Sequence, residues 1–290
     1  MSWPTGSPGA AAVAGVIAGW PARSARRAES VLGLLGAFGA AAGWPGTAEG
    51  LLDYDLIEGF CVRGRAAAAS STRGTYRSVL YALAATVHGP PGRRPSPQPG
   101  AKAPPPYSRA ERAGLAAMAA AQNSPGKRSS ALAVFVFGLG AGLRPGELAA
   151  LRGTGVTQAG GQVIVSVTGG AAPRTVPVDP PYAGRALDLA AAAGGEFVFC
   201  PGPADRAYKN FVNVFAARLA RDLDAPRLSA GRCRATFICG HLAAGTPIPA
   251  LLAVSGIAGP ESLARYARHV PGMNASKAAL RARCRAERTP

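Results

Sequence analysis

The sequence predicts a mainly α-helical protein of the α+β class, with one small β-hairpin and a division into two domains. Apolar residues recur at helical spacing over most of the 290 residues. Between residues 162 and 178, apolar and polar residues instead alternate on both sides of a turn, which is typical of paired strands. Eight prolines gather between residues 89 and 106. Because so many prolines prevent a helix or a sheet, this segment is predicted to be a semi-rigid linker between domains.

The linker divides the chain into unequal parts. Residues 1–47 consist largely of Ala, Gly, Pro and Trp and are expected to be loosely ordered, with at most a loose helix near residues 22–35. A helical pair follows, whose first member begins at Leu51 and whose second begins at Ser71 or Thr72. The expected organisation is an N-terminal extension (1–47), a helical domain (48–88), a linker (89–106), a large domain (107–272) and a basic tail (273–290).

The large domain is predicted to set the hairpin among several helices. A capping box at Ser108 and Glu111 marks the start of its first helix, and the apolar stretch 129–142 follows as a buried helix. Pro145 is suited to a first helical turn, which places Arg144 at a helix N-terminus, where an anion is favoured. Further elements are expected as strands at 162–167, 174–178 and 197–199, and as helices at 211–223, 234–244 and 248–254.

The charge of the chain predicts a polyanionic partner. Lys and Arg number 32 against 15 Asp and Glu, which leaves a net charge of +17. The basic residues are almost all arginine, whose planar fork binds phosphate through two hydrogen bonds. Such an excess is typical of proteins that bind nucleic acid or an anionic membrane surface.

Composition excludes several other classes. With 48% hydrophobic residues the chain can build a core, which excludes wholesale disorder. The five cysteines are an odd number without a CxxC motif, so we expect reduced thiols in a cytoplasmic protein, with neither a disulfide framework nor a zinc site. The most apolar stretch, 130–143, is short of the roughly 20 residues of a membrane span, and the apolar segment 9–20 lacks the preceding basic region of a signal peptide.

The order of motifs in the large domain resembles that of the tyrosine recombinase (phage integrase) family. The motifs are Gly142-Leu-Arg-Pro-Gly-Glu-Leu148, the hairpin, Arg234-Ala-Thr-Phe237, Gly256 and Arg265-Tyr-Ala-Arg-His-Val270. The resemblance covers roughly residues 50–272. It implies that the helical pair at 51–88 corresponds to the core-binding domain of the family, and the chain from Ser108 onward to its catalytic domain.

The resemblance also implies a chemistry and the residues that perform it. A tyrosine phenol attacks a DNA phosphodiester, forms a 3′-phosphotyrosyl link and releases a 5′-hydroxyl, without a metal or another cofactor. By this resemblance Tyr266 is the nucleophile. Arg144 and Arg234 would hold the negative charge of the transition state, and Glu147 would support Arg144. Read without the family, Arg144 could be a surface charge, and Arg234 one more arginine that contacts phosphate. Tyr266 could serve packing or contact DNA, and Glu147 could be only a partner of the helix dipole.

Three positions depart from the family pattern. The catalytic Lys of the hairpin turn falls at Gly169, and two family histidines fall at Gly231 and Ile257. General acid–base catalysis contributes roughly 10²–10⁴-fold per step, so these losses weaken the expectation of cleavage. Arg174 could stabilise charge but is a poor proton donor, and Lys209 is chemically better but lies in no motif. We expect His241 to be a core or surface residue.

Double-stranded DNA is the expected partner, bound by a homo-oligomer. Arg73 and Arg77 on the second helix, together with Arg174 and Lys209, are candidate phosphate contacts. The basic tail either docks on a neighbouring subunit or contacts DNA. Two functions remain open: a recombinase or integrase that cuts and rejoins DNA, and a degenerate relative that binds DNA without cutting it. A membrane-surface protein is disfavoured because no amphipathic helix has a dedicated basic face.

Overall fold

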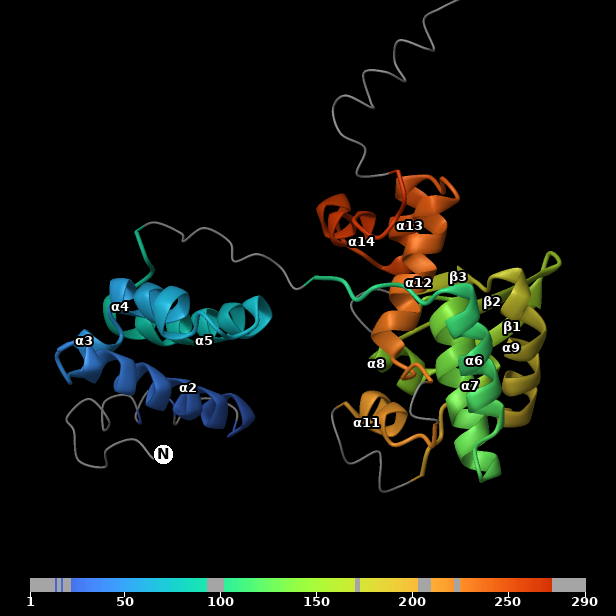
Figure 1. The fold of residues 1–290 in the computed structure, drawn as a ribbon, viewed down its shortest axis with the longest axis horizontal. Coiled ribbons are helices and arrows are strands. Elements are labelled where there is room, and N and C mark those ends of the chain that lie inside the picture. The colour runs from blue at the N-terminus through green and yellow to red at the C-terminus, as the bar shows by residue number, and fades with distance from the viewer. Residues whose placement is uncertain are drawn as a thin grey trace, which may run out of the picture. The chain divides into compact units, whose positions relative to one another are not determined.

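The computed structural model describes residues 14, 17, 22–92, 102–169, 173–202, 210–221 and 225–272. The chain forms two compact units, Met1–Ala101 and Lys102–Pro290 (Figure 1). Lys209 and the basic tail 273–290 lie outside the described residues, as do residues 93–101 of the proline-rich linker. The two units are considered separately below.

The first unit is a small helical bundle. Its elements are α2 (Ala22–Ala41), α3 (Ala48–Leu51), α4 (Tyr54–Gly59), the π-helical turn η1 (Phe60–Gly64) and α5 (Ser70–His88). The long helices α2 and α5 pack against each other, and α4 also contacts α5. The shared core contains Leu35, Ile57 and Leu83, all completely buried. The expected second helix is therefore present, and it ends at His88 as predicted.

Helix α2 differs from the expectation of a loosely ordered extension. It runs for 20 residues, and Ala28, Leu32 and Leu35 on one of its faces belong to the core of the first unit. These residues repeat at helical spacing, and alanine has the highest helix propensity, so an Ala-rich segment can form a packed helix with few large side chains. The expected division at residue 47 therefore does not separate two units of the structure.

The second unit combines a three-stranded sheet with eight described α-helices. The strands β1 (Val156–Ala159), β2 (Gln162–Val167) and β3 (Arg174–Pro177) pair antiparallel in the order β1-β2-β3. The helices are α6 (Arg109–Ala120), α7 (Pro125–Gly140), α8 (Pro145–Ala150), α9 (Pro180–Ala193), α11 (Phe211–Ala217), α12 (Ala230–Ala243), α13 (Ile248–Ser255) and α14 (Ala264–Ala267). Short 3₁₀ turns, η2 (Gly153–Gly155) and η3 (Pro260–Leu263), complete it.

The hairpin predicted from the sequence is formed by β2 and β3. Val165 pairs with Val176, and both side chains are fully buried. Strand β1 was not expected, because only Val156 of its four residues is buried and no alternation is visible. The expected strand at 197–199 was wrong: Phe197 makes an isolated bridge to Arg152, and one bridge is too short to form a strand. Helix α9 was also missed.

Helix α7 is the centre of the second unit and contacts α6, α9 and α12 (Figure 1). Its residues 133–140 are all buried, which confirms the expected core helix. Ser108 and Glu111 form the predicted capping box at the start of α6. At Gly138 a Cβ atom would lie 2.7 Å from the Cβ of Cys233, so glycine is what allows α12 to cross α7 this closely. This crossing fixes the position of the residue after Cys233, Arg234. None of the helices in the described parts is both long and apolar enough to cross a membrane.

Candidate active site

Arg144 lies at the N-cap of α8, as predicted, and its backbone is held by Glu147. The backbone N–H of Arg144 donates to Oε2 of Glu147 over 2.8 Å, which is the helix-start contact expected of an acidic residue in the first turn. The preceding Gly142 has φ +59°, and a Cβ there would lie 2.4 Å from the ring of Phe237. Glycine therefore lets this loop lie directly against α12. Helix α8 has only six residues, so its dipole contributes little positive charge at Arg144. The positive charge of the site therefore comes from side chains.

Arg234 extends from α12 and is 7% exposed. Its Nη1 donates to the backbone carbonyl of Gly142, and its Nη2 donates to that of Ser255 over 2.6 Å. Burial and then the positive charge of Arg144 lower the pKa of Arg234 to about 10. A pKa of about 10 still leaves the guanidinium charged at neutral pH. Arg234 is thus a buried cation fixed by two carbonyl groups.

Glu147 is the carboxylate that connects the arginines, and Arg174 is its main partner. Nη1 and Nη2 of Arg174 donate to the two carboxylate oxygens over 2.8 and 2.9 Å. The guanidinium of Arg144 is farther away, with Nη1 3.6 Å from Oε1. Burial acts to raise the pKa of Glu147, but the hydrogen bonds and charges of Arg174 and Arg144 outweigh it and lower the pKa. Glu147 is therefore ionised, and it binds Arg174 more closely than the Arg144 side chain that it was expected to support.

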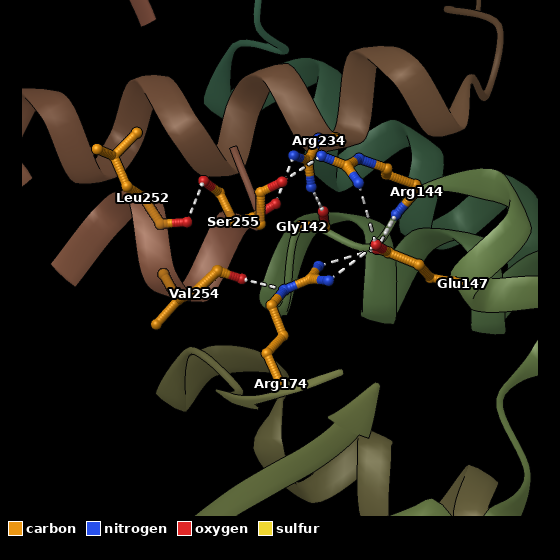
Figure 2. A network of polar contacts seen from close by, with 9 residues as sticks. Gly142, Arg144, Glu147, Arg174, Arg234, Leu252, Val254 and Ser255 are labelled. Carbon is orange, nitrogen blue, oxygen red and sulfur yellow. Dashed lines mark hydrogen bonds and ion pairs between the residues drawn. The ribbon is translucent and has the colours of Figure 1, made fainter. Parts of the chain in front are cut away.

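The C-terminal end of α13 is bound by three arginines at three successive carbonyls, as Figure 2 shows. Arg174 Nε donates to Val254 O over 2.9 Å, Arg234 Nη2 to Ser255 O, and Arg144 Nη2 to Gly256 O over 2.5 Å. The arginines come from β3, α12 and the start of α8. The negative end of the helix thus holds side chains that are far apart in the sequence.

The network carries an excess of positive charge, and Arg144 is its most exposed member. The network holds three guanidinium groups and the single carboxylate of Glu147, which pairs with Arg174 and Arg144, so two positive charges are left uncompensated within it. The side chain of Arg144 is 37% exposed, whereas that of Arg174 is 9% exposed. An anion can therefore approach through Arg144. Chemically, the arrangement suits the binding of a tetrahedral oxyanion by N–H groups fixed in advance.

Tyr266 lies on α14, which packs against α12. The tyrosine is 4% exposed and belongs to an apolar cluster with Ile238 and Leu263. Its phenol oxygen accepts a hydrogen bond from Nη2 of Arg265 over 3.0 Å. The same cluster contains Ile257, which directly follows Gly256, whose carbonyl accepts from Arg144. The structure thus brings the three arginines and Glu147 together, and it buries Tyr266 in the apolar cluster that begins where the network ends, at Ile257.

The three departures from the family pattern lie in different surroundings. Gly169 follows β2 and is half-buried, with its Cβ direction 3.2 Å from the side chain of Ala150. Gly231 is exposed in the first turn of α12. Ile257 is buried in the apolar cluster that contains Tyr266. None of these positions supplies a proton donor.

The two histidines of the large unit are engaged elsewhere. His241 has Nε2 3.3 Å from Oδ1 of Asp179 and Nδ1 3.0 Å from Oγ1 of Thr246. His269 makes a contact of 2.9 Å between Nε2 and the carbonyl of Ala103. Both side chains therefore join segments of the fold. In the described part of the chain, no group of three His, Cys, Asp or Glu residues could hold a metal ion.

The three predicted DNA contacts that lie in the described residues all have partners inside the protein. Arg77 forms a forked pair with Glu58, whose Oε1 also accepts from the hydroxyl of Tyr81, and the Arg77 side chain is 11% exposed. Arg174 is buried in the network described above. Arg73 is half-buried and donates to the carbonyl of Ala66 over 3.2 Å. Lys209 falls outside the described residues.

Sequence reasoning missed the carbonyl groups of Val254, Ser255 and Gly256, and it took Arg174 as a candidate phosphate contact. Backbone carbonyls leave no signal in a sequence. Arg174 had one usable signal, since its strand pairs with β2 and Val167 opposite it is buried. A charged side chain beside a buried position requires a partner of opposite charge. The motif that precedes the hairpin, residues 142–148, contains one acidic residue, Glu147, and this residue is the partner of Arg174.

The fold can be compared with solved structures. The XerH site-specific recombinase, bound to a palindromic difH substrate in a post-cleavage complex, matches with a TM-score of 0.56 at 15% sequence identity, over 79% of this chain and 72% of that one. The Tn1549 transposon integrase in complex with transposon right-end DNA matches with a TM-score of 0.54 at 17% identity, over 80% and 84% of the two chains. The same integrase in complex with circular intermediate DNA matches with a TM-score of 0.53 at 16% sequence identity, over 80% of this chain and 86% of that one.

These likenesses establish the fold. Mainly helical, with a small three-stranded antiparallel sheet, it is the fold of the tyrosine recombinase catalytic domain. No model of a known protein family matches the chain, and no characterised protein matches it in sequence.

Proposed function

We propose that this protein is a site-specific DNA recombinase or integrase that cuts and rejoins DNA through a covalent 3′-phosphotyrosyl intermediate. The observation that carries the proposal is the convergence of Arg144 and Arg234 on one end of α13, with Glu147 beside them. It is supported by the fold, which is shared with recombinases whose structures contain DNA.

In the proposed reaction, the arginine network binds a DNA phosphate. Remaining N–H groups of Arg144 and Arg234 would donate to the non-bridging oxygens, where negative charge grows in the transition state. The phenol oxygen of Tyr266 attacks phosphorus, so an O–P bond forms as the bond from phosphorus to the 5′ oxygen breaks. The phenol proton is released, and the 5′ oxygen takes up a proton. Attack by a 5′-hydroxyl of another strand reverses these steps and rejoins DNA.

The buried state of Tyr266 adds a requirement to this mechanism. Its side chain is 4% exposed and its hydroxyl is bonded to Arg265. A DNA phosphate is too large to enter the apolar cluster, so the segment between Gly256 and Tyr266 has to shift toward the arginines. We propose that DNA binding drives this shift.

DNA binding is expected to rest on the net charge of +17 and on many phosphate contacts. Arg73 remains a proposed DNA contact in the first unit. Arg77 instead donates its hydrogen bonds to Glu58 and is better explained as a structural residue. Lys209 and the tail 273–290 are proposed contacts from the sequence alone. Action as a homo-oligomer on DNA, and a cytoplasmic location, belong to the same proposal.

A second function, DNA binding without cleavage, is favoured by one specific observation. The positions of the family Lys and two His are Gly169, Gly231 and Ile257, and His241 and His269 are engaged by other groups. Neither histidine of the described large unit is thereby placed to give a proton to the leaving 5′ oxygen. Water would have to do so, at a cost in rate.

Covalent trapping separates the two functions. Nicked DNA fragments that cover the sequence flanking the gene are incubated with the protein, denatured in SDS and examined for a protein–DNA adduct. An adduct with the unaltered protein that disappears in Tyr266→Phe supports the recombinase. Retardation of the same DNA without an adduct favours the binding protein, and a protein that does neither contradicts both.

A further inference from the structure

We propose that Arg174 is a positioning residue, which fixes Arg144 and Arg234 at the spacing that a phosphate requires. This inference rests on the proposed function. It replaces the expectation that Arg174 contacts DNA, and it assigns a specific task to a side chain outside the arginine pair.

All three nitrogen atoms of the Arg174 guanidinium are used within the protein. Nη1 and Nη2 bind the two oxygens of Glu147, and Nε binds Val254 O, with distances between 2.8 and 2.9 Å. The side chain is also 9% exposed. Three of its five N–H groups are thus used, and two of them pair its charge with Glu147, whereas Arg234 binds only carbonyl groups. The charge of Arg174 is therefore already neutralised within the protein, and that of Arg234 is left for an anion.

Arg174 touches both supports of the arginine pair. The first support is Glu147, whose Oε2 also accepts from the backbone N–H of Arg144. The second is the C-terminus of α13, where the carbonyls of Ser255 and Gly256 hold Arg234 and Arg144. By joining Glu147 to Val254, Arg174 ties the start of α8 to the end of α13 (Figure 2).

The geometry is specific to arginine. A lysine carries its three N–H donors on a single nitrogen, so it could not reproduce the planar fork on Glu147 together with the bond to Val254. The backbone has adapted to the fork as well. A Cβ at Gly256 would lie 2.9 Å from Nη1 of Arg174, so this glycine leaves the room that the guanidinium occupies.

The test compares Arg174→Lys with Arg144→Ala and with Arg152→Lys as a matched control. Arg152 also donates to a backbone carbonyl, that of Gly195, but lies outside the network. Each variant is measured for DNA affinity over a series of salt concentrations and for the rate of adduct formation on nicked DNA. Circular dichroism in the near ultraviolet checks that each variant is folded.

For a positioning residue we expect Arg174→Lys to form the adduct about 100-fold more slowly. Its slope of log Kd against log salt should stay that of the unaltered protein, since no phosphate contact is lost. Arg144→Ala should make the slope shallower by about 0.9, because one phosphate contact goes. Arg152→Lys should change neither. A slope in Arg174→Lys that falls like that of Arg144→Ala, or an unchanged adduct rate, would overturn the inference.

A second arm keeps the inference testable if the protein forms no adduct and the proposed cleavage fails. Orthovanadate is titrated into the free protein at low salt by calorimetry, since this tetrahedral oxyanion needs only the aligned arginines. Weaker binding by Arg174→Lys, with Arg152→Lys unchanged, supports positioning without any cleavage. Equal affinity in all variants, or no binding by the unaltered protein, overturns it. If Arg174→Lys does not fold, the double variant Glu147→Gln with Arg174→Met, which leaves no unpaired carboxylate, takes its place.

Discussion

Arg265 binds the hydroxyl of its own neighbour in the chain, Tyr266. Its Nη2 lies 3.0 Å from the phenol oxygen, and its guanidinium carbon lies 4.9 Å from the centre of the ring. Adjacent residues of a helix normally point apart, so this contact depends on the shortness of α14, which has four residues. It gives a polar partner to a hydroxyl that otherwise lies among apolar side chains.

Arg265→Met should therefore destabilise the protein without disturbing its core. Loss of one hydrogen bond to a buried hydroxyl costs about 1 kcal/mol in the free energy of unfolding. The measurement is urea unfolding of the single variants Arg265→Met and Tyr266→Phe and of the double variant. In Tyr266→Phe the hydroxyl is already gone, so the second substitution should cost clearly less there. Equal costs in both backgrounds would mean that the hydrogen bond contributes nothing.

Glu147→Gln should reduce the stability strongly at neutral pH and much less in acid. The substitution leaves the buried cation of Arg174 without its counter-ion, at a cost of about 3 kcal/mol. The pKa of Glu147 is lowered in the folded protein, so the stability from its charge is present above the ordinary carboxyl pKa, about 4.3, and is lost as the pH falls through the lower folded value. Urea unfolding of both proteins between pH 7 and pH 3 measures this difference. A difference that stays constant to pH 3 would contradict the role of the Glu147 charge.

Arg77→Ala should affect stability rather than DNA binding. Arg77 forms a fork on Glu58, and its guanidinium carbon lies 5.7 Å from the centre of the Tyr81 ring. Loss of these charged hydrogen bonds is expected to cost about 1.5 kcal/mol in the free energy of unfolding. Arg73→Ala on the same helix is the matched control, because Arg73 makes a single bond of 3.2 Å to a carbonyl. For DNA affinity measured against salt, only Arg73→Ala should make the slope shallower, by about 0.9. A shallower slope in Arg77→Ala would restore it as a phosphate contact.

The sequence predicted those features that depend on short-range signals. The capping box of Ser108 and Glu111, the helix start at Pro145 and the pairing of β2 with β3 all follow from residues a few positions apart. Helix α2 was underestimated because small residues give a weak apolar pattern, although they pack closely. The partners of Arg174 could not be deduced, since Glu147 and Val254 are 27 and 80 positions away.

Gly256→Ala provides the sharpest test of how the end of α13 holds the arginines. Gly256 has φ +61°, a conformation that costs a non-glycine residue about 1 kcal/mol, and its new methyl group would also meet Arg174 at 2.9 Å. Gly245→Ala is the matched control, because Gly245 has φ +74° but no atom within 4 Å of its Cβ position.

Both variants should lose the backbone contribution to the free energy of unfolding, and Gly256→Ala should lose more because Arg174 has to move. Movement of Arg174 disturbs Glu147 and thereby Arg144, so the adduct on nicked DNA should form more slowly in Gly256→Ala and at the normal rate in Gly245→Ala. Urea unfolding and the adduct assay measure the two effects. Equal losses of stability and equal adduct rates would show that the room beside Gly256 is not needed by Arg174, since only the left-handed backbone would then matter.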